Sequence, residues 1–226
     1  MVYIDRFIPE LLVPDARYPP TRKIGIQTRS LTGTVPDSNR YESSLEGDFM
    51  VLVRNDPDFL SFNAQPVVVP MTKPDGRLAR PYRPDGLVQW KSGKTAWLVE
   101  IKYRKDCSGQ WRVLRRKFRA ASDFAVARGW VFKVFSEDRI RGARLQNLQF
   151  LEDYGRRRVR PKIEDLVREA IASGKSTPAD VVAEVASKGV GSADALPSLW
   201  RLIARREVQI DFGLKLTMTS KLWIGP

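Results

Sequence analysis

The sequence predicts an α/β fold, with a mixed sheet flanked by helices and a small winged-helix-like C-terminal domain. Two apolar, strand-like segments, residues 82–90 and 95–103, stand on either side of a short polar stretch. A helical pattern and a further strand-like segment follow them. Beyond the basic, proline-terminated run "GRRRVRP", three helical patterns precede a stretch that alternates around a glycine. This run divides the chain into predicted domains 1–158 and 159–226.

The first part of the chain predicts an arm, a helix and an edge strand. Residues 1–40 are rich in Pro, Arg and Thr with weak periodicity, which predicts an irregular arm. A helix is expected next, because Leu45 and Phe49 are at helical spacing and Ser43 or Ser44 can cap its start. Residues 64–71 form a short β-branched run flanked by prolines, which predicts an edge strand.

A hairpin is predicted where the two apolar strands meet. With Ser92 and Gly93 as a two-residue turn, Asp85 lies directly opposite Glu100, with Cβ atoms about 5 Å apart. Lys102 follows Glu100 by two residues, so it projects from the same face of the sheet.

The remaining elements follow from periodicity and caps. A helix with a basic first half is expected at residues 111–129, and a strand at 130–138. Residues 137–158 are helical or irregular. Thr177 followed by Pro178 is typical of a helix start. The C-terminal domain is predicted to hold three helices and a final strand pair, at residues 162–174, 177–189, 195–208 and 208–224.

Composition favours a nucleic-acid partner and excludes several chemistries. Lys and Arg total 39 against 26 Asp and Glu, a net charge of +13, which favours polyanions; the alternative is a basic protein without such a partner. The absence of histidine excludes Ser-His-Asp hydrolysis and His-zinc sites. The single cysteine, Cys107, excludes an internal disulfide. No membrane-spanning run or secretory signal is seen, so we expect a cytoplasmic, nucleoid-associated protein.

The facing carboxylates of the hairpin indicate a metal site. Two carboxylates this close repel each other and need a compensating cation when partly buried. Lys102 supplies part of the compensating positive charge, and a divalent metal ion would supply more. Oxygen ligands suit Mg²⁺, for which Mn²⁺ can substitute. The alternative is a surface hairpin with cross-strand ion pairs, worth under about 1 kcal/mol each. The strands are too apolar for a solvated ribbon, which favours the metal site.

Several motifs resemble a known nuclease family. Pro84-Asp85 followed by Glu100-Ile101-Lys102 is similar to the PD-(D/E)xK nuclease signature. The upstream text, "SLTGTVPDSNRYESSLEGDFMVLVRNDPDFLSFNAQPVVVP", resembles the N-terminal endonuclease domain of TnsA. That subunit cuts the 5′ transposon ends in a heteromeric cut-and-paste transposase. The resemblance covers about residues 25–136.

The resemblance implies a restriction-endonuclease-like core and roles for four residues. Glu46 would be the helix-borne catalytic acid and a metal ligand, a choice over Glu42 that spacing alone does not make. Asp85 would be the central metal ligand, Glu100 the second ligand and Lys102 the catalytic lysine. A winged-helix-like C-terminal domain, a strand-transfer transposase subunit and an AAA+ ATPase regulator as partners are implied as well.

A run of basic residues after the active strand predicts DNA contact. These side chains could hold phosphates of double-stranded DNA beside the metal, and such contacts dominate affinity without selecting a sequence. The alternative is a solvated helix face. The predicted DNA-binding residues are Arg104, Lys105, Arg112, Arg115, Arg116, Lys117 and Arg119.

The function predicted from the sequence is therefore a Mg²⁺-dependent DNA endonuclease subunit that hydrolyses phosphodiesters at the 5′ ends of a transposon. Two alternatives stay open. One is a restriction-type endonuclease on the same core. The other is a non-catalytic DNA-binding adaptor with a vestigial nuclease fold.

Overall fold

The structure, a computed structural model, describes residues 33–35, 39–41, 43–73 and 75–225. Most of the predicted N-terminal arm, and Glu42, lie outside these residues. The described part of that arm holds two short antiparallel strands, β1 (Gly33–Val35) and β2 (Asn39–Tyr41). The chain forms two compact units that divide between Ile140 and Arg141.

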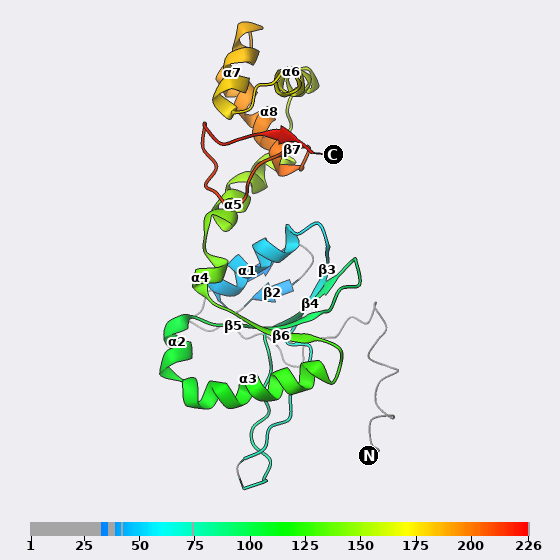
Figure 1. The fold of residues 1–226 in the computed structure, drawn as a ribbon, viewed down its shortest axis with the longest axis vertical. Coiled ribbons are helices and arrows are strands. Elements are labelled where there is room, and N and C mark those ends of the chain that lie inside the picture. The colour runs from blue at the N-terminus through cyan, green and yellow to red at the C-terminus, as the bar shows by residue number, and fades with distance from the viewer. Residues whose placement is uncertain (1–32, 36–38, 42, 74, 226) are drawn as a thin grey trace. The chain divides into compact units, whose positions relative to one another are not determined.

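The first unit is built on a four-stranded mixed sheet in the order β3-β4-β5-β6. The strands are β3 (Phe59–Ala64), β4 (Gly86–Trp90), β5 (Trp97–Ile101) and β6 (Val131–Phe135). The first three run antiparallel and β6 runs parallel to β5. Helix α1 (Ser44–Arg54) lies on one side of the sheet and α3 (Trp111–Val126) on the other (Figure 1). The α/β class and the mixed sheet are confirmed.

Strands β4 and β5 are apolar on both faces because helices cover both. Val88 and Val99 pack in the cluster that α1 supplies with Leu45 and Phe49. The intervening side chains, such as Leu98, pack against α3 in a second cluster. Fully burying such a side chain contributes about 1.5–3 kcal/mol, so the two central strands anchor the unit and fix their own register.

Helix α1 begins and ends as the sequence predicts. The Ser43 side chain accepts a hydrogen bond from the Glu46 backbone N–H at 3.2 Å, which satisfies one donor of the first turn. The Glu46 carboxylate accepts from the Ser43 hydroxyl at 3.1 Å. The helix ends at Arg54, before Pro57.

The edge strand is not where the sequence predicts it. The edge strand of the sheet is β3, Phe59–Ala64, and of the predicted segment 64–71 only Ala64 belongs to it. Gln65 has a positive φ of 45°, which turns the chain away from the sheet, and Pro66 has no N–H to donate to a neighbouring strand.

Residues 67–73 and 75–83 instead form a narrow antiparallel excursion, which we call the 67–83 ribbon. Isolated β-bridges join Val69 to Tyr82 and Thr72 to Leu78. Its tip turns at Asp75 and Gly76, where Gly76 has a φ of 80°. The ribbon projects past α3 from the ends of β3 and β4 (Figure 1).

Helix α3 confirms the predicted basic helix. Two shorter helices of this unit, α2 (Arg104–Gly109) and α4 (Glu137–Ile140), were not predicted as separate elements. Helix α2 lies between the end of β5 and the start of α3, so part of the basic run stands outside α3.

The second unit is mainly helical. It contains α5 (Ala143–Arg156), α6 (Pro161–Ala172), α7 (Pro178–Ser187) and α8 (Ser192–Ala204). The three predicted C-terminal helices are α6, α7 and α8. Leu151 of α5 packs in the same core as Leu199 and Ile203 of α8. For this reason α5 groups with the second unit, whereas the boundary predicted at residue 158 places it in the first.

The final strand pair is shorter than the sequence suggests. Strand β7 (Val208–Gln209) pairs antiparallel with β8 (Trp223–Ile224), and residues 210–222 connect them. Three helices followed by this pair is the element order expected for a winged helix, and that assignment stays a prediction. No helix among the described residues is long and apolar enough to cross a bilayer.

Candidate active site

The register of β4 and β5 brings Asp85 to Glu100. Gly86 pairs with Val99 and Leu87 with Leu98, so the next facing positions beyond Gly86 are Asp85 and Glu100. This register was predicted from a two-residue turn, and that turn is wrong. Strand β4 ends at Trp90, strand β5 begins at Trp97, and a six-residue loop, 91–96, joins them.

The loop is held by a side chain that the hairpin prediction did not consider. Asp58 accepts hydrogen bonds from the Ser92 backbone N–H at 2.8 Å and from the Ser92 hydroxyl at 2.9 Å, and Lys94 pairs with it at 2.8 Å. The apolar packing of both strands therefore sets the register, and the loop adapts to it.

The Asp85 carboxylate accepts a hydrogen bond from a backbone N–H of β5, where a carbonyl of a paired strand would otherwise be the acceptor. Its Oδ2 accepts from the Ile101 backbone N–H at 2.6 Å. Asp85 precedes the first paired residue of β4, and Pro84 before it has no N–H to extend the ladder. The carboxylate is thus fixed at the edge where β4 leaves β5, and it is half-buried.

Glu100 is more deeply buried, with 5% of its surface exposed. Its Oε2 accepts a hydrogen bond of 2.6 Å from the hydroxyl of Tyr82, itself buried at the base of the 67–83 ribbon. The Lys102 ammonium lies 3.6 Å from Oε1. The Glu100 carboxylate is therefore held between a neutral donor and a cation, and the prediction that Lys102 shares its face is confirmed.

The surroundings of the two carboxylates raise the pKa of each. Burial raises the pKa of Asp85 well above its usual value, and the charges of Glu100 and Glu46 raise it further. Burial also raises the pKa of Glu100, against the hydrogen bond from Tyr82 and the charge of Lys102. Such raised values are found at sites that bind cations or move protons.

Glu46 lies near this pair without joining it. It belongs to the first turn of α1, the helix that packs on the opposite face of the sheet from Leu98. Among the residues that the structure describes, no three Asp, Glu, Cys or His side chains form a group able to hold a metal ion. The role of Glu46 as a third ligand stays a prediction.

The chemistry of the Asp85–Glu100 pair nonetheless fits Mg²⁺. Both groups offer hard oxygen ligands, and a bound cation would offset the charge of Glu100 that raises the pKa of Asp85. Mg²⁺ is commonly bound by one or two carboxylates together with waters and substrate phosphates. The pair is of this chemical type, and Mg²⁺ binding by it stays a prediction.

Comparison with protein families decides the identity. The model described as "TnsA-like endonuclease N terminal" matches residues 56–137, and the model described as "TnsA endonuclease C terminal" matches residues 139–212. The chain belongs to the TnsA-like endonuclease family. No curated protein matches the chain. The two family models meet at nearly the same point as the two compact units.

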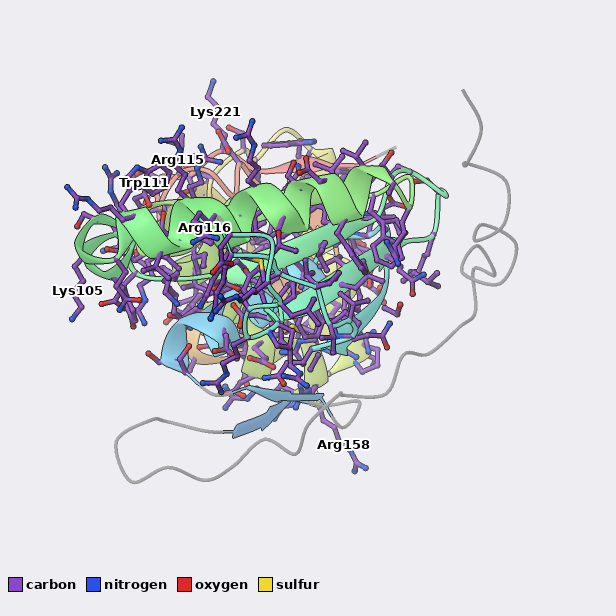
Figure 2. All side chains as sticks on the ribbon, turned by 90° about the horizontal axis from the view of Figure 1, so that it is seen from below. Lys105, Trp111, Arg115, Arg116, Arg158 and Lys221 are labelled. Atoms are coloured by element: carbon purple, nitrogen blue, oxygen red, sulfur yellow. The ribbon has the colours of Figure 1, made fainter. Side chains whose placement is uncertain are left out.

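In this TnsA-like chain the predicted DNA-binding residues lie on α2 and α3. Six of the seven are exposed, and Lys117 is half-buried. Figure 2 shows Arg115 projecting from α3 and Arg116 beneath it. The Arg104 guanidinium lies 3.2 Å from Asp138, so its charge is already paired. The DNA contact predicted for these residues is untested.

The role of Tyr82 was missed by sequence reasoning. It lies eighteen positions before Glu100, as the first residue of the predicted strand at 82–90, and tyrosine is common in cores. The signal was weak: a tyrosine flanked by Pro81 and Arg83, three residues before Asp85. Only the antiparallel pairing of Tyr82 with Val69, through backbone hydrogen bonds of 2.8 and 2.9 Å, places its hydroxyl at the carboxylate.

Proposed function

We propose that this TnsA-like endonuclease is a Mg²⁺-dependent DNA endonuclease subunit of a heteromeric cut-and-paste transposase, hydrolysing phosphodiesters at the 5′ transposon ends. The observation that carries the proposal is the half-buried Asp85 facing the buried Glu100, with Lys102 3.6 Å from the latter. Membership of the family supports the endonuclease activity and a place in a transposition complex.

The chain's own residues have distinct tasks in this proposal. Asp85 and Glu100 would hold Mg²⁺, which supplies Lewis-acid polarisation of the scissile phosphodiester when bound. The Ile101 N–H fixes the Asp85 carboxylate, and the Tyr82 hydroxyl fixes that of Glu100. Lys102 places an ammonium where it stabilises negative charge growing on the phosphate or orients the attacking water.

A strand-transfer transposase and an AAA+ regulator are the partners that we propose for this subunit, because a TnsA-like endonuclease acts within a transposition complex. The test is a reconstituted reaction in which Asp85→Ala and Glu100→Ala each abolish cutting at the 5′ ends while DNA binding and folding persist. An exposed carboxylate of α5, changed in Asp153→Asn, is the matched control and should leave cutting unchanged.

Two results would redirect the proposal. Normal 5′-end cutting by both alanine variants would show that these carboxylates are not catalytic and would favour a DNA-binding adaptor. Cutting of plain plasmid DNA at a fixed sequence by the purified chain alone would favour a restriction-type nuclease.

A further inference from the structure

The 67–83 ribbon is a basic element beside the active site. It carries four basic residues, Lys73, Arg77, Arg80 and Arg83, against one acidic residue, Asp75. Lys73, Arg77 and Arg80 are exposed. The charges of this ribbon are not part of the carboxylate site, and the ribbon does not extend the central sheet.

The ribbon is held against another basic element. The Arg116 guanidinium of α3 donates a 2.7 Å hydrogen bond to the Thr72 carbonyl, and the Lys117 ammonium lies 5.6 Å from the centroid of the Tyr82 ring. Figure 2 shows Arg116 pointing toward the ribbon. Two positive elements placed side by side repel each other, and this repulsion is relieved when a polyanion contacts both.

The base of the ribbon is part of the catalytic neighbourhood. Tyr82 pairs with Val69 across the ribbon and donates its hydroxyl to Glu100. A molecule that contacts the base of the ribbon therefore lies next to the carboxylates. Double-stranded DNA, the substrate in the proposed function, is a polyanion that passes this point.

The shape of the ribbon suits a groove of duplex DNA. It is two strands wide, and the major groove of B-DNA accepts a two-stranded ribbon. Leu78 lies opposite Thr72 in the ribbon and is 82% exposed. In a major groove an apolar side chain can meet thymine methyl groups.

We propose that the 67–83 ribbon is a DNA-binding element that enters the major groove of the substrate duplex next to the cleavage site. Arg77 and Arg80 contact phosphates, and Leu78 contacts base edges. Because strands rise about 3.3 Å per residue, Arg77 lies about 17 Å along the ribbon from Tyr82. This inference rests on the proposed function, because it takes duplex DNA as the substrate.

The test is the salt dependence with which the full chain binds a 30-base-pair duplex, measured by fluorescence anisotropy. The double variant Arg77→Gln/Arg80→Gln should raise the Kd about tenfold and lower the slope of log K against log salt by about 2, roughly one unit per lost phosphate contact. Leu78→Ser should raise the Kd with the slope unchanged.

The matched control removes two charges from the loop at the other end of β4. Lys91 and Lys94 are both exposed, and Lys91→Gln/Lys94→Gln should leave the slope unchanged. An equal fall in the slope for both double variants would mean that the overall field, and not the ribbon, holds the DNA, and it would overturn the inference.

The remaining outcomes separate this inference from the proposed function. If the ribbon variants keep the wild-type slope, DNA binding by the ribbon is wrong and the proposed function is unaffected. If their cutting nevertheless falls in a reconstituted transposition reaction, the ribbon contacts a protein partner. If Leu78→Ser binds as tightly as the wild type, insertion into the groove is wrong. If the wild-type chain binds no duplex at all, and Asp85→Ala does not affect cutting, the proposed function itself fails.

Discussion

Each of the two units buries a glutamate, and the two glutamates have different charged neighbours. Glu164 of α6, 7% exposed, forms a close ion pair with Arg201 of α8 inside the second unit. Glu100, 5% exposed, has a lysine at 3.6 Å on one oxygen and a tyrosine hydroxyl on the other, with the Asp85 carboxylate as its neighbour. Glu164 has an arginine as its ion-pair partner, whereas Glu100 lies beside a second carboxylate whose pKa it raises.

The difference indicates what each charge does. A buried pair that is matched one to one contributes to the definition of the fold, because removing one partner leaves a buried charge uncompensated. A buried carboxylate pair with raised pKa values makes the folded state less stable until a cation arrives. Such a cost to stability persists at functional sites. Under the proposed function, the first unit carries the chemistry and the Glu164–Arg201 pair supports the fold of the second.

The largest expected effect is that of Asp85→Asn. It should lower cleavage by about a thousandfold or more, since the proposed metal ligand is worth several kcal/mol in the transition state. Asparagine keeps an acceptor for the Ile101 N–H, so the fold should survive. Cleavage in a reconstituted reaction, beside circular dichroism of the variant, measures both; retention of a tenth of the activity would contradict the metal role.

The same variant should be more stable than the wild type without metal at neutral pH. Because the pKa of Asp85 is raised on folding, its ionisation opposes folding as the pH rises through that raised value. The stability gain of Asp85→Asn should therefore vanish below about pH 4, where the carboxyl is protonated in both states. Melting temperatures in EDTA across pH 3.5–8 test this, and Mg²⁺ should stabilise the wild type alone.

The opposite behaviour is expected of Arg201→Gln in the second unit. It leaves Glu164 buried without its cation, which costs about 3 kcal/mol or more of unfolding free energy. Cleavage per folded molecule should not change. Urea denaturation measures the free energy of unfolding, and a cleavage assay normalised to the concentration of folded protein measures the activity. A loss of cleavage without a loss of stability would show that this pair acts in function and would break the comparison.

A smaller effect is expected from Tyr82→Phe, which removes one donor from Glu100 and keeps the ring. Mg²⁺ affinity, measured by titration calorimetry, should fall about tenfold, the usual effect of losing a partner that orients a ligand. Raising the Mg²⁺ concentration should restore cleavage. Tyr154→Phe in α5 is the matched control. If affinity is unchanged and cleavage still falls, Tyr82 does not act through metal binding.

The smallest effect is expected from Ser43→Ala. Loss of the α1 cap should cost about 1 kcal/mol, or about 2–4 °C in Tm for a chain of this size. Because the Ser43 hydroxyl also donates to the Glu46 carboxylate, the cleavage rate reports on Glu46. A fall in cleavage well beyond the loss of stability would support Glu46 as a catalytic acid, and no fall would count against it.

Sequence reasoning succeeded where a local rule determines the structure. The serine cap of α1, the apolar alternation of β4 and β5, and the Thr177 cap of α7, whose side chain accepts from the Asp180 N–H, follow from short-range chemistry. The register of Asp85 and Glu100 was correct although the turn was wrong, because packing on both faces of the sheet fixed the same alignment.

Sequence reasoning failed where contacts between residues far apart in the chain determine the structure. The edge strand was misplaced because the positive φ of Gln65 depends on tertiary contacts and is not a preference of glutamine. Helix α5 was assigned to the first domain because the packing of Leu151 on α8 leaves no mark in the local sequence.

By itself, the sequence determined the α/β class, the basic charge, the absence of histidine chemistry and the pairing of Asp85 with Glu100, all of which depend on residue type and short-range periodicity. Only the tertiary structure decided that Tyr82 holds Glu100, that Asp58 shapes the loop after β4 and that a basic ribbon stands beside the site. These contacts join residues far apart in the chain, and their geometry exists only once the sheet and its covering helices have packed.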